Sequence, residues 1–255
     1  MKTTKRKNQI LAYLRAMQRI VRVDELSQLL HVSPLTIRRN LQELESEKVI
    51  IRTHGGCMIA GRTMLETEYH KNVNLNFSLK QSIGIRAAEE VLAGEVILVD
   101  DGSTTFHLGT HLGSISPLQV YTNSLALVSE LNRFPGIDLS ILGGVVNSDG
   151  YSVTGFLTEH QIEQICFDKV FLGVDAIDNN GRCYVKSKET ARLSQIMLRS
   201  GSKKIILCDH TKVGQEAHFS YASLDDFDKL ITTHGIEEKT LDKYKTMTTI
   251  IHAQN

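Results

Sequence analysis

The segment Val32–Leu41 constrains the fold of this chain more than any other stretch, because it has the marks of an amphipathic helix. Ser33 can cap the first turn through its hydroxyl, and Pro34 suits the first helical position, where no amide donor is required. Apolar side chains then recur at i, i+4 and i+7, and they are Ile37, Leu41 and Leu44. Such a stripe must face a core, so the opposite face is left to meet solvent or a partner.

The helical period also fixes which side chains lie opposite the apolar stripe. At about 100° per residue, the residues that point away from the core are Leu35, Thr36, Arg39, Gln42 and Glu43, with Arg38 and Asn40 on the flanks. Most of these side chains are polar and long enough to reach a DNA groove. The segment is therefore predicted to be a DNA-recognition helix.

The surrounding segments predict a winged helix-turn-helix. The expected order is a helix over 5–18, a short strand over 20–23, a helix capped by Asp24, a tight turn at 31–32, the helix from Pro34, a strand over 49–52 and a wing turn at Gly55–Gly56. This order is that of winged DNA-binding domains. A three-helix domain without a ligand is the alternative.

The charge distribution favours DNA binding over that alternative. Residues 1–57 hold 11 Lys and Arg against 5 Asp and Glu, a net charge of +6, and the whole chain holds 29 of each, so residues 58–255 carry −6. A basic head on an acidic body is typical of a phosphate-binding domain joined to a non-binding one. The DNA-binding residues predicted are Ser33, Leu35, Thr36, Arg38, Arg39, Asn40, Gln42, Arg52 and His54, with Lys2, Lys5, Arg6 and Lys7 as a basic cluster beside them.

The rest of the chain predicts a second domain of the α/β class. Short apolar strands, such as 96–99, 119–121, 139–142, 170–172, 204–207 and 230–231, alternate mostly with helical stretches. This alternation predicts a largely parallel sheet. We expect domains at 1–57 and 79–255, joined by a polar linker over 58–78.

Ligands of such sheets bind beyond the carboxyl ends of the strands, so the residues after each strand are the candidates for a second site. The loop Asp100–Thr105 combines a glycine with three hydroxyls at a helix start, which suits a phosphate, although a capped turn without a ligand fits that loop equally well on its own. Further polar residues follow the other strands, and the predicted effector-binding set is Asp100, Gly102, Ser103, Thr104, Thr105, Thr122, Asn123, Ser124, Gly143, Gly144, Asp175, Lys188, Glu189 and Lys212. Hydroxyls, carboxylates and lysines together suit a phosphorylated sugar. Neither a dinucleotide nor a P-loop fingerprint is present.

These residues resemble a known family. The order Arg6, Ile10, Leu14, Val23–Leu26, Val32–Ser33, Thr36–Leu41, Leu44 and Arg52–Gly56 is similar to that of the DeoR family of bacterial transcription regulators. Asn40 and Cys57 depart from the family's usual Asp and Ala. Asn40 removes a negative charge near the DNA-facing side, so it is a position that can tune operator choice.

The resemblance also implies a sensor domain, itself similar to ribose-5-phosphate isomerase. By that likeness Asp175, Lys188 and Glu189 occupy the places of the isomerase's acid-base groups, with Lys186 as an alternative to Lys188. A phosphosugar isomerase with a DNA-binding head is therefore the main alternative, and a purely architectural DNA binder is a third. The DNA-binding head favours a ligand-responsive regulator, because ligand occupancy can change DNA affinity without turnover.

We therefore expect a cytoplasmic transcriptional regulator, and more specifically a repressor of a carbohydrate-catabolism operon. Its expected partners are double-stranded operator DNA, a phosphorylated sugar effector and further copies of itself in a homodimer or homotetramer. No apolar run approaches the length of about 20 residues that spans a membrane. The four cysteines have no metal-binding spacing, and neither a cofactor nor a catalytic set is predicted.

Overall fold

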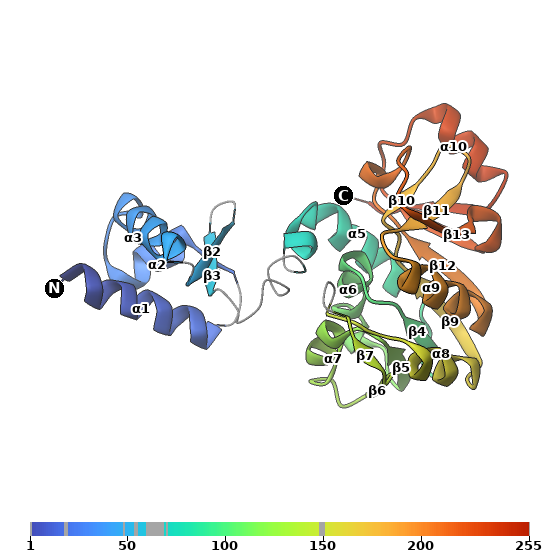
Figure 1. The fold of residues 1–255 in the computed structure, drawn as a ribbon, viewed down its shortest axis with the longest axis horizontal. Coiled ribbons are helices and arrows are strands. Elements are labelled where there is room, and N and C mark those ends of the chain that lie inside the picture. Colours follow the sequence, from blue (N-terminus) through green and yellow to red (C-terminus); the bar gives the residue numbers. More distant parts are fainter. Residues whose placement is uncertain are drawn as a thin grey trace. The chain divides into compact units, whose positions relative to one another are not determined.

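The computed structural model describes residues 2–17, 20–47, 49–53, 56–59, 69, 71–147 and 151–254. Contacts within the chain divide it into two compact units, Met1–Glu68 and Tyr69–Asn255. Each unit has its own core, and each is described by itself (Figure 1).

The first unit is a three-helix domain with a small antiparallel sheet. Its elements are α1 (Lys2–Met17), β1 (Val21–Arg22), α2 (Val23–Leu30), α3 (Pro34–Ser46), β2 (Ile50–Thr53) and β3 (Gly56–Ile59). The sheet order is β1-β3-β2, so β2 and β3 form a hairpin that β1 joins from the side of the helices. This order confirms the winged helix-turn-helix.

The start and the buried face of α3 agree with the sequence prediction. The Ser33 hydroxyl accepts a hydrogen bond from the Thr36 amide at 3.3 Å, and Pro34 occupies the first turn. The apolar stripe of α3 is buried against side chains from α1 and α2, and the cluster includes Ile10, Leu14, Leu26, Ile37, Leu41 and Leu44. The exposed face of α3 is therefore fixed by the core beneath it.

Of the other predictions for this region, one differs from the structure and some lie outside the described residues. Asp24 does not cap α2: the helix begins at Val23 after Arg22, and Asp24 lies in its first turn, where a carboxylate still favours the helix dipole. The wing turn at Gly55 and the predicted DNA contact His54 lie outside the described residues. The predicted linker 58–78 overlaps the end of β3 and the start of α5 (Phe77–Ala88), and residues 71–74 are helical.

The second unit is built on a seven-stranded sheet in which every neighbouring pair is parallel. Its strands are β4 (Val96–Val99), β5 (Leu118–Thr122), β6 (Ile137–Ile141), β9 (Phe167–Leu172), β12 (Gly201–Leu207), β14 (Lys229–Thr232) and β15 (Thr249–His252). Six of these strands overlap the predicted apolar runs, whereas β15 was not predicted. The parallel sheet confirms the predicted α/β fold class.

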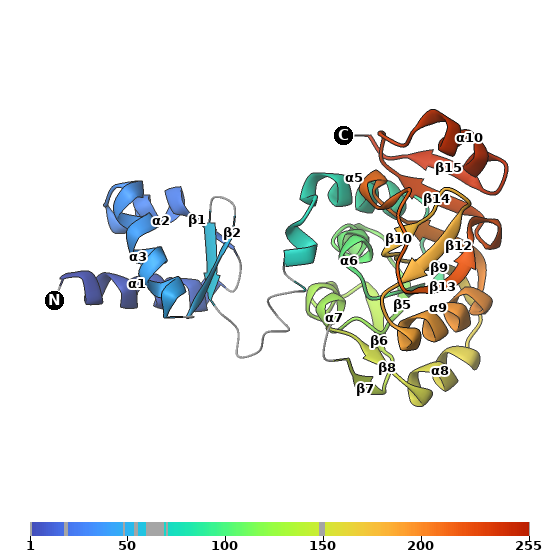
Figure 2. The ribbon, with the colours of Figure 1, turned by 45° about the horizontal axis from the view of Figure 1, so that its top comes forward.

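Helices cover both faces of this sheet, as both views show (Figures 1 and 2). One face carries α5, α6 (Ser103–Gly109) and α7 (Leu125–Leu131), and the other carries α8 (Phe156–Glu163) and α9 (Lys188–Ser200). Strand side chains alternate between the two cores: Ile97 and Val99 face α5–α7, while Leu98 faces α8 and α9. The helix α10 (Glu238–Lys245) precedes β15.

Two smaller antiparallel sheets complete the unit, and neither was predicted. One consists of β10 (Ala176–Ile177), β11 (Arg182–Val185) and β13 (Phe219–Ser223), and the other of β7 (Val145–Val146) and β8 (Val153–Thr154). Three short 3₁₀ turns lie at Leu112–Ser114, His210–Lys212 and Leu224–Asp226.

The strand order β15-β14-β12-β9-β4-β5-β6 places a topological switch point between β4 and β9. The chain adds β5 and β6 on one side of β4, and it then returns to add β9, β12, β14 and β15 on the other side. Connections leave the two central strands in opposite directions, which opens a crevice at their carboxyl ends. Open parallel sheets bind ligands at this place.

Gly84 lets α5 lie in backbone contact with α6. A Cβ added at Gly84 would approach the His107 carbonyl carbon and oxygen to 2.5 Å. Gly84→Ala is therefore expected to destabilise the protein by about 1–3 kcal/mol, although the same change at an exposed helix position stabilises by roughly 0.5–1 kcal/mol. Thermal unfolding monitored by circular dichroism measures the change. Gln81→Ala, at an exposed position of the same helix, is the control, and a Gly84→Ala melting temperature equal to or above that of the wild type contradicts the close contact.

Candidate nucleic-acid interface and effector site

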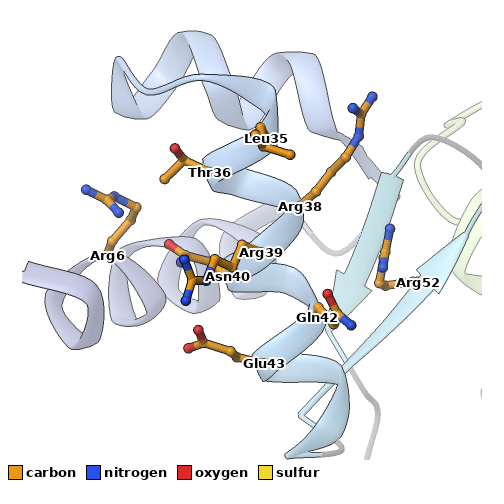
Figure 3. A pocket seen from close by; sticks show the side chains of 9 residues that line it. All are labelled: Arg6, Leu35, Thr36, Arg38, Arg39, Asn40, Gln42, Glu43 and Arg52. Atoms are coloured by element: carbon orange, nitrogen blue, oxygen red, sulfur yellow. The ribbon is translucent and has the colours of Figure 1, made fainter.

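The exposed face of α3 lines a concave surface of the first unit. Its lining residues come from α1, α3 and β2, and they are Arg6, Leu35, Thr36, Arg38, Arg39, Asn40, Gln42, Glu43 and Arg52 (Figure 3). Leu35 is 75% exposed, and Arg38, Arg39 and Gln42 are exposed as well. The side chains predicted to lie opposite the apolar stripe therefore do so.

Ion pairs leave this surface strongly basic. Glu43 lies on it, but its carboxylate is 2.9 Å from the Lys7 ammonium, which also contacts Glu47 at 2.8 Å. The hydrogen bond from Lys7 lowers the pKa of Glu43, and the two carboxylates raise the pKa of Lys7. Lys7, predicted as part of the N-terminal basic cluster, joins α1 to α3 and to Glu47 at the end of that helix. The other cations of the surface are Arg6, Arg38, Arg39 and Arg52, and the Arg52 guanidinium lies 3.8 Å from the Glu45 carboxylate.

Asn40 differs from the other predicted DNA-binding residues because it is only 3% exposed. Its Oδ1 is buried without a hydrogen-bond partner among the described residues. The helical period placed Asn40 on the flank of the exposed face, and neighbouring side chains cover that flank. Its predicted role in groove contact is not supported by its burial, although it lines the concave surface (Figure 3).

In the second unit, polar groups meet at the switch point. Asp100 follows β4, is 4% exposed, and accepts a hydrogen bond from the Gly173 amide, which follows β9, at 3.3 Å. Asn123, which follows β5, accepts from the Asp101 amide at 2.9 Å and donates to the Asp101 carboxylate at 3.1 Å. The loops after three neighbouring strands are therefore joined at one edge of the sheet.

The hydroxyl groups at this edge differ in whether they make a hydrogen bond within the protein. Thr104 is 2% exposed, and its Oγ1 has no hydrogen-bond partner among the described residues. Thr105 donates to the Gly102 carbonyl at 3.0 Å, and Thr122 donates to the Val99 carbonyl at 2.7 Å. Ser124 caps α7 by accepting from the Leu127 amide at 3.3 Å. Among these residues, Thr104 thus has a buried hydroxyl that makes no hydrogen bond to the described part of the chain.

The groups assigned by likeness to the isomerase are mostly exposed. Asp175 accepts a hydrogen bond from the Lys186 amide at 3.0 Å, and the Lys186 ammonium lies 3.9 Å from its carboxylate. The Lys188 side chain is 77% exposed and lies 3.8 Å from the carboxylate of Glu189, which is itself exposed. Gly143 and Gly144, after β6, are exposed, and the Gly143 amide donates to Gln161 at 2.7 Å. Lys188 and Glu189 therefore lie outside the buried cluster.

Two lysines, Lys80 and Lys212, lie near the loops that follow β9 and β12 at this edge of the sheet. The Lys212 ammonium donates to the Val174 carbonyl at 2.6 Å. Lys80, from α5, is 2% exposed and donates to the Asn72 carbonyl. Burial and the nearby charge of Lys212 lower the pKa of Lys80 to about 8. Asp209, between these elements, is fully buried, and its Oδ2 has no partner among the described residues.

Lys80 was not among the predicted site residues, and Asp209 enters the prediction only through the loop that it shares with Lys212. Lys80 lies next to the apolar stripe of its helix, and periodicity assigns such a residue to the surface. Asp209 begins the polar loop after β12 that also holds Thr211 and Lys212, and this position is the feature of the sequence that indicates it.

Within the described part of the chain, no group of three His, Cys, Asp or Glu side chains is arranged to hold a metal ion. None of the described helices has the length and apolar character needed to cross a membrane.

The two units together define a class of protein: a winged-helix DNA-binding domain joined to an α/β domain with a buried polar site at its switch point. The model of the DeoR-like helix-turn-helix domain matches residues 6–63, and that of the DeoR C-terminal sensor domain matches residues 75–234. The chain belongs to the DeoR family. It is a DNA-binding transcriptional regulator with a C-terminal sensor domain.

Curated relatives align with nearly the whole chain. The chain is 29% identical over 242 residues to a putative aga operon transcriptional repressor of Escherichia coli O157:H7, covering 94% of this chain and 90% of that protein. It is 31% identical over 210 residues to the HTH-type transcriptional regulator GlpR of Haloferax volcanii, covering 82% of each.

The predicted likeness to ribose-5-phosphate isomerase is weak in three dimensions. The enzyme from Methanocaldococcus jannaschii matches with a TM-score of 0.40 and 17% identity, over 54% of this chain and 55% of that one. At this level the likeness supports neither an activity nor the role of any residue. The family therefore favours a regulator over the isomerase alternative.

Asp100 gives this site a measurable pH dependence. Burial, together with the charge of Asp101, raises the pKa of Asp100 well above its ordinary value. Above the ordinary carboxyl pKa of about 4, the unfolded chain has released a proton that the folded chain still holds. The contribution of Asp100 to the free energy of unfolding is therefore fully present below pH 4. It is lost as the pH rises through the raised pKa, by up to about 1.4 kcal/mol per pH unit.

Asp100→Asn is expected to remove this loss, so the variant gains stability relative to the wild type as the pH rises from 4. Urea unfolding at a series of pH values, followed by tyrosine fluorescence, measures the difference, because six of the seven tyrosines lie in the second unit. Asp138→Asn, at an exposed position on β6, is the matched control. Parallel stability profiles for Asp100→Asn and the wild type contradict the assignment.

Proposed function

We propose that this regulator is a repressor of a carbohydrate-catabolism operon and that a phosphorylated sugar modulates its DNA binding. The observation that carries the proposal is the buried polar cluster at the switch point between β4 and β9, in the same chain as the arginine-rich face of α3. The printed name of one relative, a putative aga operon transcriptional repressor, supports the sign of regulation. A DNA-binding regulator acts where the bacterial chromosome lies, in the cytoplasm.

On the DNA side, α3 enters the major groove with its exposed face. Arg39 and Gln42 have side chains suited to hydrogen bonding with base edges, and Leu35 and Thr36 can contact thymine methyl groups. Arg38 and Arg52 lie at the side of this face, where phosphates pass (Figure 3). One such head offers limited contact, so paired heads in a homodimer or homotetramer bind a two-fold operator.

On the effector side, the loop Gly102–Thr105 receives the phosphate through its amides and hydroxyls. The Thr104 hydroxyl, buried and without a hydrogen-bond partner among the described residues, supplies a contact to the phosphate. Asp100 and Asp175 bind sugar hydroxyls, and Lys212 contributes a positive charge from the loop after β12. A phosphate with several hydroxyls matches this combination.

Regulation requires the effector to bind one conformation of the protein more tightly than another, and it does not require the protein to convert the effector. The effector changes DNA affinity if it binds more tightly to the conformation whose heads do not fit the operator. An isomerase would instead convert the phosphosugar, so product formation on incubation with the protein separates the two hypotheses.

Arg39→Ala is expected to lower the affinity for a duplex from the protein's own upstream region by about tenfold or more, because a base contact contributes roughly 1–3 kcal/mol. Binding of the phosphosugar is expected to be unchanged. A gel-shift titration measures the affinity, and Arg22→Ala, which removes an equal charge from an exposed position on β1, is the control. If Arg39→Ala and the wild type bind equally, Arg39 is not in the interface.

Thr104→Val and Lys212→Ala are expected to leave DNA affinity unchanged and to raise the phosphosugar concentration for half-release of DNA by about tenfold, since each removes a polar contact of roughly 1–3 kcal/mol. The phosphosugar is first chosen by thermal shift from a panel that includes glucose 6-phosphate and ribose 5-phosphate. Thr110→Val removes a hydroxyl that bonds the His107 carbonyl at 2.8 Å and is the control for Thr104. Unchanged affinity of both variants in calorimetry contradicts the placement of the site.

A further inference from the structure

The chain enters the second unit directly against the candidate effector site. Tyr69 is the first described residue after 60–68, and it is only 6% exposed. Its ring stacks on that of Tyr151, with centroids 5.3 Å apart, and meets the edge of Phe106 at 6.2 Å. Ala126 and Val73 belong to the same cluster. A connection between domains is usually exposed and polar, so this burial needs an explanation.

Two of the residues that pack against Tyr69 lie close in sequence to predicted effector residues. Phe106 follows Thr105 in α6, and Ala126 lies two residues after Ser124 in α7. Tyr151 accepts a hydrogen bond from the Leu125 amide at 2.8 Å through its carbonyl. Burial and the charge of Asp101 raise the pKa of Tyr69, so its phenol lies within electrostatic reach of the site.

Residues 71–76 are attached to the same edge at two more points. The Val73 carbonyl contacts His107 Nε2 at 3.2 Å, and His107 is in α6. Asn76 donates to the Thr211 hydroxyl at 3.0 Å, and Thr211 donates to the Asp209 carboxylate at 2.5 Å. The segment therefore bridges α6 and the loop after β12.

Lys80 adds an attachment within this arrangement. Its buried ammonium donates to the Asn72 carbonyl, which lies inside the segment. We call Tyr69 together with residues 71–76 the strap. Its attachments end on α5, on α6, on α7, on Tyr151 and on the loop 209–212, which carries the predicted effector contact Lys212.

We propose that the strap transmits effector occupancy from the switch point towards the DNA-binding unit, and that Tyr69 is its positioning residue. The proposal rests on the proposed function, because it needs an effector at this site. A ligand that contacts Gly102–Thr105 and Lys212 can shift α6 and the loop 209–212. Because Tyr69 packs on α6 and Asn76 bonds to that loop, such a shift moves both ends of the strap. Packed clusters respond to such shifts by changing between discrete arrangements.

The test compares DNA affinity with and without the phosphosugar that gives the largest thermal shift in the panel of hexose and pentose monophosphates. The ratio of the two affinities measures the coupling, which is typically about 5–150-fold in allosteric proteins. Tyr69→Ala in the full chain is expected to keep DNA affinity and phosphosugar affinity within about threefold of the wild type and to reduce the coupling ratio towards one. Tyr69→Phe keeps the ring and is expected to retain the coupling.

A second variant and a measurement on the wild type keep the proposal testable if Tyr69→Ala unfolds. Asn76→Gly removes the contact with Thr211 and suits the left-handed backbone at this position, where φ is 56°. It is expected to reduce the coupling ratio as well. In the wild type, the phosphosugar is expected to slow amide hydrogen exchange in residues 69–80 by about threefold or more, measured by mass spectrometry.

If Tyr69→Ala and Asn76→Gly both have the coupling ratio of the wild type, the role of the strap is wrong and the proposed function still holds. The same conclusion follows if the phosphosugar releases DNA from the wild-type protein but leaves hydrogen exchange in residues 69–80 unchanged. A wild-type protein that binds no phosphosugar, or whose DNA affinity does not respond to one, overturns the proposed function and the strap with it. The two failures are distinguishable because the second is seen without any variant.

Discussion

The parallel arrangement of the seven strands is the constraint on which the second unit depends. Parallel pairing places all carboxyl ends at one edge, and the reversal of strand order at β4 concentrates the polar loops there. The hydrogen bond from the Gly173 amide to Asp100 joins the two strands at the reversal. Helices on both faces bury the sheet, so this edge is where the central strands leave their apolar cover.

Several features follow from local chemistry and were therefore predictable from the sequence. Ser33 and Pro34 define the start of α3 whatever surrounds it, and the apolar stripe from Ile37 to Leu44 defines its buried face. The strand β4 was predicted at its observed bounds because four consecutive apolar residues have to be buried on both faces. These predictions depend only on neighbours in the sequence.

Other features depend on distant parts of the chain, and the sequence pattern did not contain them. The burial of Asn40 depends on how the first unit packs around α3, and Lys7 is ion-paired because α1 and α3 lie side by side. The strands β10 and β7 have two residues each, too few to display a period. Tyr69 lies in a polar stretch that predicts a linker, and its burial arises from residues beyond position 100. Sequence reasoning located the edge of the sheet correctly and missed what packs beside it.

The glycine at position 84 has a mechanical consequence. Where side chains separate two helices, small rotations of those side chains absorb a displacement, but α5 and α6 meet through their main chains. Main-chain contacts at close-packed density are nearly incompressible. The last turn of α6 and α5, the helix that continues from the strap, are therefore expected to move together, so that a displacement of one is passed to the other with little loss.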